Sequence, residues 1–146
     1  MVKRIIVYGE SGEMAGRAHV DTNEIGEIVA EVYDEEGNKL GAVKYEPSDM
    51  KPYLAYVYDP DGAQLGFLQL ERYEIGIFGS DILWREQPGE EYDKKGHVRM
   101  ESADNNTAIV REKAETGEQI GSLEGQNVSG EELTLIGGAA ALLVLL

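Results

Sequence analysis

The sequence lacks cysteine and is poor in basic residues. Among its 146 residues, 13 Lys and Arg stand against 28 Asp and Glu, which gives a formal charge of −15. The absence of cysteine excludes disulfides, thiolate metal sites and cysteine nucleophiles. Phosphate backbones and anionic membrane surfaces are bound by several basic residues acting together, and no such cluster is present. We therefore predict that nucleic acid is not a partner.

The first residues also lack the features of a secretory signal. The chain reaches Gly9-Glu10 after a short apolar run, without a small-residue cleavage site. A signal peptide needs a longer apolar segment and such a site. We therefore expect a cytoplasmic protein. A chain of this length is normally one domain, and we expect one domain over residues 1–146.

No motif for a metal or a nucleotide can be recognised. The phosphate-binding glycine loops of nucleotide-binding proteins are missing. Asp59-Pro60-Asp61-Gly62 resembles the start of a calcium loop, but the fifth and twelfth positions are Ala63 and Leu70, which carry no side-chain oxygen. His19 and His97 have no metal-ligand spacing, and we predict that both are surface or turn residues.

Catalytic residues cannot be singled out either. Carboxylate pairs are too abundant for any one of them to indicate an acid–base dyad. The serines Ser11, Ser80, Ser102 and Ser122 have no histidine or lysine neighbour that suggests a nucleophilic triad. The prediction is therefore a non-enzymatic protein with no catalytic residues, no cofactor and no metal.

What the sequence does contain is a 25-residue repeat over its first half. The unit reads V-Y-[DG]-x-x-G-x-x-[AL]-G and begins at Val7, Val32 and Val57. Each copy has a turn glycine and, four residues later, a second glycine. The turn glycines are Gly12, Gly37 and Gly62, and the second glycines are Gly16, Gly41 and Gly66.

The chemistry of the repeat predicts a β-hairpin. The residues before each turn are rich in Val, Ile and Tyr, which suit a half-buried strand. The carboxylates of Asp34 and Asp59 can accept hydrogen bonds from backbone amides two residues on and so open a type I turn. Gly37 and Gly62 can then adopt the left-handed conformation that closes the turn with a bulge.

The pattern continues in degraded form. Residues 92–98 resemble the turn of a fourth copy, and residues 108–111 followed by 117–121 resemble a fifth. Residues 73–84 supply further strand material. We therefore predict hairpin repeats over residues 1–128, with about five hairpins and about ten to twelve strands of usual length. The predicted loops are residues 46–52, 86–91 and 102–107.

The C-terminal segment is apolar throughout. From Leu133 onward it carries no charge, and the preceding Ser129-Gly130-Glu131-Glu132 has the form of a capping box. We predict a helix over residues 130–146 that must be buried on every side. Gly137 and Gly138 give it a slim stretch that fits a narrow space.

Fourteen apolar residues reach only about 21 Å along a helix, less than the hydrocarbon core of a membrane. Burial in protein is therefore favoured over lipid, either across the chain's own sheet or at a subunit interface, which leaves a homo-oligomer open. Insertion of the tail in lipid, or pairing with a partner helix, remains the alternative.

Hairpin repeats of the Y-D-x-x-G-x-x-L-G type followed by an apolar C-terminal helix resemble the tubby C-terminal-like superfamily, which includes phospholipid scramblase and LURP-one-related proteins. The resemblance implies an all-β fold, a closed antiparallel barrel with the C-terminal helix along its axis. The basic residues with which tubby domains hold phosphoinositides have no counterpart in this chain, so lipid binding is not implied.

The tyrosines offer a second possible recognition surface. Tyr56 and Tyr58 should share one face of a strand, with Val57 on the other. Tyrosine is favoured at interfaces, although cross-strand packing is the commoner use. The aromatic set consists of Tyr53, Tyr56, Tyr58, Tyr73, Phe67 and Phe78. The hypothesis is a non-enzymatic binding or scaffolding domain; the alternative is an adaptor that uses its apolar tail.

Overall fold

The computed structural model describes residues 2–22, 24–45, 53–87, 89–103 and 106–146. In these residues eleven strands precede one helix. The predicted loop at 46–52 lies outside the described residues. The elements are β1 (Lys3–Gly9), β2 (Met14–Thr22), β3 (Ile28–Asp34), β4 (Lys39–Tyr45), β5 (Leu54–Tyr58), β6 (Gln64–Gln69), β7 (Glu71–Glu74), β8 (Ile77–Trp84), β9 (Asp93–Met100), β10 (Thr107–Glu112), β11 (Gln119–Gln126) and α1 (Gly130–Leu145).

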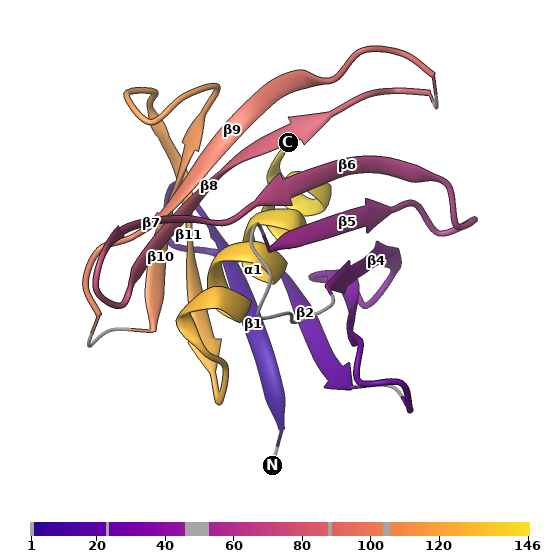
Figure 1. Ribbon diagram of the computed structural model, residues 1–146, viewed down its shortest axis with the longest axis horizontal. Coiled ribbons are helices and arrows are strands. Elements are labelled where there is room, and N and C mark those ends of the chain that lie inside the picture. The colour runs from indigo at the N-terminus through magenta and orange to yellow at the C-terminus, as the bar shows by residue number, and fades with distance from the viewer. Residues whose placement is uncertain (1, 23, 46–52, 88, 104–105) are drawn as a thin grey trace.

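The strands form a closed antiparallel barrel. Their order is β6-β5-β4-β3-β2-β1-β11-β10-β9-β8, and a pairing of β6 with β8 closes the ring of ten strands (Figure 1). The short strand β7 continues from β6 and pairs with the first part of β8. The predicted all-β barrel of about ten to twelve strands with a C-terminal helix is confirmed.

Helix α1 fills the interior of the barrel. It contacts each of the ten barrel strands, and its residues from Glu132 to Leu142 are buried (Figure 1). A Cβ atom on Gly137 would lie 2.7 Å from Leu123 Cδ1, so the two glycines do provide the slim stretch that the sequence predicts. Of the alternatives for the apolar C-terminal segment, the structure shows the first: the segment is buried inside the chain's own barrel. No helix in the described residues is long and apolar enough to span a membrane.

The first three hairpins follow the predicted turn chemistry. The Asp34 Oδ1 accepts hydrogen bonds from the backbone N–H groups of Glu36 and Asn38, at 2.9 and 2.8 Å. Asp59 Oδ1 likewise accepts hydrogen bonds from the backbone N–H groups of Asp61 and Ala63, at 2.9 Å each. The turn glycines Gly12, Gly37 and Gly62 have φ values of +85°, +90° and +91°. The aspartates of the supposed calcium loop therefore serve the turn.

Five glycines form a ring around the C-terminal end of α1: the second glycines of the first three copies of the repeat, together with Gly96 and Gly121. Each lies next to a β-bulge in its own strand, where the residue before the glycine has no partner in the ladder. A Cβ atom at any of them would crowd both a carbonyl oxygen of a neighbouring strand and an apolar side chain of the last helical turns. We call them the glycine ring, and they are Gly16, Gly41, Gly66, Gly96 and Gly121.

The fourth copy of the repeat is placed differently from the prediction. Residues 93–98 do not form a turn but lie in β9, which begins at Asp93, whereas β8 ends at Trp84. Ile82 takes the place of the valine of the repeat, since it pairs with Gly96 in the β8–β9 ladder. The prediction was wrong because Asp93-Lys94-Lys95-Gly96 contains residues that are common in turns. In the structure Gly96 lies within a strand, and a glycine is needed there because the strand passes close to the end of the helix.

Candidate functional site

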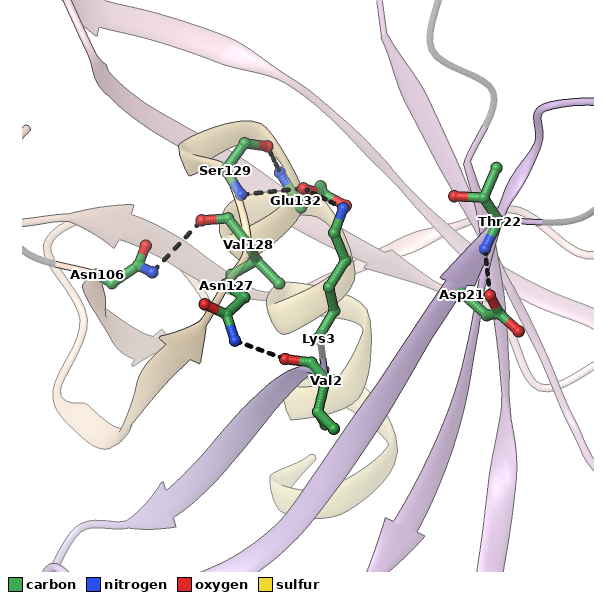
Figure 2. Close-up of polar contacts among 9 residues, drawn as sticks. All are labelled: Val2, Lys3, Asp21, Thr22, Asn106, Asn127, Val128, Ser129 and Glu132. Carbon is green, nitrogen blue, oxygen red and sulfur yellow. Dashed lines mark hydrogen bonds and ion pairs between the residues drawn. The ribbon is translucent and has the colours of Figure 1, made fainter.

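Polar contacts close the barrel where the chain enters α1 (Figure 2). The Ser129 hydroxyl accepts a hydrogen bond from the Glu132 N–H at 3.1 Å, and Glu132 Oε1 accepts one from the Ser129 N–H at 2.9 Å. The predicted capping box is thus confirmed. The Lys3 ammonium lies 3.2 Å from Glu132 Oε2 and ties β1 to the first helical turn.

Two asparagines hold the segment that leads into the helix. Asn127 Nδ2 donates to the Val2 carbonyl oxygen at 2.7 Å (Figure 2). Asn106 Nδ2 donates to the carbonyl oxygens of Gly125 and Val128, at 3.2 and 3.3 Å. These bonds satisfy backbone groups next to a residue with φ +60°, Asn127. We therefore interpret this end of the barrel as structural.

The outer surface of β5, β6 and β8 carries a contiguous set of aromatic and apolar side chains. Tyr56 lies opposite Phe67 across the β5–β6 ladder, and Phe67 lies opposite Leu83 across the closing ladder. The Phe67 and Tyr92 rings meet edge to face, with centroids 4.8 Å apart. Burial, followed by the charge of Glu27, raises the pKa of Tyr58. We call this surface the aromatic wall; it consists of Tyr56, Tyr58, Phe67, Leu83 and Tyr92.

The structure divides the aromatic set that the sequence groups together. Tyr56 and Tyr58 face outward while Val57 is buried, as strand alternation predicts. Phe78, in contrast, is a core residue that is 5% exposed. Tyr73 lies on β7, where its ring covers Gly79. These two residues therefore lie apart from the outward-facing Tyr56 and Tyr58.

A depression of about 230 Å³ adjoins the aromatic wall where β6 passes into β7. Phe67, Leu83 and Gln69 line it together with the carboxylates of Glu71 and Asp81. Glu71 pairs with Gly79, two residues before Asp81, so the two acidic residues are diagonal neighbours on the outer face. The depression thus combines apolar side chains with two strong hydrogen-bond acceptors.

His97 links these two carboxylates. Its Nδ1 lies 2.9 Å from Asp81 Oδ1, and its Nε2 lies 3.1 Å from the Tyr73 phenolic oxygen. The Tyr73 hydroxyl in turn lies 3.0 Å from Glu71 Oε2. The imidazole is 2% exposed, so the prediction that His97 is a surface or turn residue was wrong. Its neighbour Gly96 faces the helix, and His97 therefore faces outward, where Tyr73 covers it.

Tyr73 is held in place over His97 by its surroundings. A Cβ atom on Gly79 would overlap its ring, so the glycine allows the close approach. The Arg99 guanidinium lies 4.0 Å from the ring centroid. Burial and, next, the hydrogen bond to Glu71 raise the pKa of Tyr73, so the phenol keeps its proton. Lys94 Nζ completes the group at 3.2 Å from Asp81 Oδ1.

The other histidine belongs to a similar but exposed group. His19 is exposed on β2, as the sequence predicts, and its ring meets the edge of Tyr33 at 5.6 Å. The Tyr33 hydroxyl donates to Glu31 Oε2 at 2.6 Å, and Arg17 Nε donates to His19 Nε2 at 3.0 Å. Among the described residues no carboxylate bonds to the His19 ring.

The remaining candidate residues show no site of their own. Ser80 is fully buried, and its hydroxyl donates to the Asp81 carbonyl oxygen at 2.8 Å. Within the described ranges, no group of three histidine or acidic side chains could hold a metal ion. A wider hollow of about 690 Å³ at the end of α1 is lined by Lys94, Lys95 and Lys113 with two acidic residues. Its mixed charges do not indicate a ligand of one sign.

Comparisons with known proteins add no assignment to this geometry. The chain matches no protein-family model, no curated protein and no solved structure. The features that remain to indicate a function are the filled interior, the aromatic wall and the depression with two oriented carboxylates.

Proposed function

We propose that this protein is a non-enzymatic binding domain that recognises a basic polypeptide segment on its outer surface. The observation that carries the proposal is the aromatic wall beside the carboxylates of Glu71 and Asp81. Tyrosine and other aromatic residues are favoured at the centre of protein interfaces. Since α1 occupies the interior, a ligand has no room inside the barrel.

The charge of the protein supports a basic partner. A net charge of −15 attracts cations over long distances and repels other acidic proteins. Tyr73 holds one oxygen of Glu71, and His97 and Lys94 share one oxygen of Asp81; the other oxygen of each carboxylate has no partner among the described residues. Those oxygens can accept hydrogen bonds from a lysine or arginine side chain without any rearrangement.

A catalytic role is the alternative class, because Asp81, His97 and Tyr73 follow the order carboxylate, imidazole and hydroxyl of a nucleophilic triad. Two observations support the non-enzymatic proposal instead. The raised pKa of Tyr73 works against an activated phenolate. Tyr73 also covers the imidazole, which is 2% exposed and out of reach of a substrate.

The resemblance to the tubby C-terminal-like superfamily and the cytoplasmic location belong to the same proposal. A closed antiparallel barrel around a C-terminal helix supports the first at the level of architecture. It extends to no lipid site, since the basic residues of tubby domains have no counterpart. A partner that meets the outer wall fits a scaffolding protein whose helix serves its own fold.

The test is a titration of the full chain with two synthetic peptides, one containing lysine, arginine and apolar residues and one with glutamate in place of the basic residues. We expect amide shifts in β6 and β8 with the basic peptide and none with the acidic one. Phe67→Ala and Glu71→Gln should each weaken binding about tenfold, as expected of residues at the centre of an interface.

The matched control is Glu124→Gln, which removes the same charge from the outer face of β11. An equal loss of affinity in this variant would mean general charge attraction and would overturn the proposal. Shifts confined to the ends of the barrel, or no binding at all, would do the same.

A further inference from the structure

The hydroxyl proton of Tyr73 has two acceptors within reach. Glu71 Oε2 lies 3.0 Å from the phenolic oxygen, and His97 Nε2 lies 3.1 Å from it. A phenol has one proton to donate. A neutral His97 can donate from Nδ1 to Asp81, and then Nε2 competes with Glu71 for the one Tyr73 proton. It can instead donate from Nε2 to Tyr73, and then its contact with Asp81 has no proton, so in either tautomer one of the three contacts is not a hydrogen bond.

The doubly protonated imidazole resolves this shortage. His97 then donates from Nδ1 to Asp81 and from Nε2 to the Tyr73 oxygen, which leaves the Tyr73 proton for Glu71. All three contacts become hydrogen bonds, and the series ends on a carboxylate at each side, Asp81 at one and Glu71 at the other. Bonds with one charged partner are about twice as strong as neutral ones.

This network attaches a strand that has little else to hold it. The backbone of β7 lies beside that of β8 alone among the described elements, and it does not approach α1. Its pairing with β8 spans only the positions from Glu71 to Glu74. The Tyr73 side chain bonds to His97 on β9 and stacks with Arg99, so it is a large part of what fixes β7 to the barrel, while Glu71 holds the phenol from within the same strand.

We propose that His97 is a proton-dependent latch, which fastens β7 to the barrel wall when the imidazole carries both protons and loosens it when one proton leaves. Because Glu71 lines the depression, the latch also sets the shape of the binding surface, and this consequence rests on the proposed function. The attachment of β7 itself does not depend on it.

Other charged groups around the imidazole act in both directions. Asp81 and Glu71 favour its positive charge, while Lys94, at 3.2 Å from Asp81 Oδ1, and Arg99, stacked on Tyr73, oppose it. Glu115 pairs with Arg99 and reduces that opposition. Imidazole titrates between about pH 5 and 8, above the range of ordinary carboxyl groups. Within that range the latch should close as the pH falls.

The experiment is amide hydrogen exchange of the full chain at pH 5.5 and 7.5, corrected for the intrinsic effect of pH. We expect the protection of β7 to be about fivefold higher at the lower pH, the change that one added hydrogen bond gives. The protection of β3, measured in the same sample, should not change. Nitrogen-15 shifts of the His97 ring should report two protonated nitrogens at pH 5.5.

Two variants with matched controls decide the outcome. His97→Gln and Tyr73→Phe should each abolish the pH dependence, whereas His19→Gln and Tyr33→Phe, from the similar exposed group, should keep it. If His97→Gln does not fold, Tyr73→Phe alone carries the test. Equal protection of β7 at both pH values, or a pH dependence that survives Tyr73→Phe, would overturn the latch. Neither result involves a ligand, so the proposed binding function is judged separately.

Discussion

The two ends of α1 are held in the barrel by different means. At its N-terminal end the helix is fixed by polar groups, since Glu132 bonds to Ser129 and pairs with Lys3. At its C-terminal end the contacts are apolar, and the strands come close because the glycine ring has no side chains. The N-terminal end depends on a few directional hydrogen bonds, and the C-terminal end depends on the absence of side chains in the glycine ring.

This difference teaches which changes each end can tolerate. A hydrogen bond that is lost at the polar end can be replaced in part by water, because Lys3 is 40% exposed there. An atom added at the glycine ring has no space to enter, because protein interiors are close-packed and yield little. We therefore expect substitutions in the glycine ring to have the larger effects.

The largest effect is expected for Gly121→Val. A Cβ atom there would lie 2.5 Å from Leu145 Cδ1 and would also crowd the Tyr8 carbonyl oxygen, which cannot move without disturbing β1. We expect a loss of about 3 kcal/mol or more of unfolding free energy, measured by urea denaturation. Ser122→Val, one residue on and facing outward, is the control and should change it by less than about 0.5 kcal/mol. Similar losses in both variants would contradict the comparison.

At the polar end, Glu132→Ala should cost about 2 kcal/mol, because it removes the capping bond and the partner of Lys3. Ser129→Ala should cost about 1 kcal/mol, the usual value of an N-cap. Lys3→Ala should cost less than about 1 kcal/mol, as expected of a partly exposed ion pair. Thermal and urea unfolding of the three variants checks this order, and a Lys3 variant less stable than the Glu132 variant would reverse it.

Between the two ends of α1, the burial of one hydroxyl group is not compensated by a hydrogen bond. Thr134 on α1 is fully buried, and its Oγ1 has no hydrogen-bond partner among the described groups. Thr134→Val replaces the hydroxyl with a methyl group of similar size, so we expect a gain of up to about 1 kcal/mol. Leu135→Val, at the next buried position, is the control and should lose stability. A destabilised Thr134→Val would indicate that the hydroxyl has a partner after all.

The smallest effect is expected at the hairpin tips, outside the helix contacts. Hydrogen bonds from the backbone and side chain of Asn38 lower the pKa of Asp34. A lowered pKa means that the contribution of Asp34 is fully present above the ordinary carboxyl pKa and is lost as the pH falls below about 4. Stability measured from pH 5 to 3 should therefore fall slightly less in Asp34→Asn. Asp61→Asn, at the next hairpin tip, is the charge-matched control and should follow the unmodified chain.

Local chemistry explains how far the sequence could predict the fold. The hairpins at Val7, Val32 and Val57 were predicted because each turn is formed by residues next to one another in the chain. The helix was predicted because its cap and its apolar run are local as well. The fourth hairpin was misplaced because its connection, residues 85–92, lacks the turn pattern of the repeat.

The candidate site was beyond such reasoning. Tyr73, Asp81 and His97 come from three strands and meet only because β7 folds back along β8. A signal was present, since Glu-x-Tyr occurs at Glu31-Val32-Tyr33, Glu71-Arg72-Tyr73 and Glu90-Glu91-Tyr92. It could not reveal which of the three would be joined by a buried histidine.

The sequence by itself determined the hairpins, their turns and the cap and burial of the apolar helix, because each follows from neighbouring residues and from the cost of exposing an apolar face. Only the tertiary structure decided that the second glycines surround α1, that His97 is covered, and that two carboxylates share a depression. These features depend on distances between strands that are far apart in the chain. The closure of β6 on β8 fixes those distances.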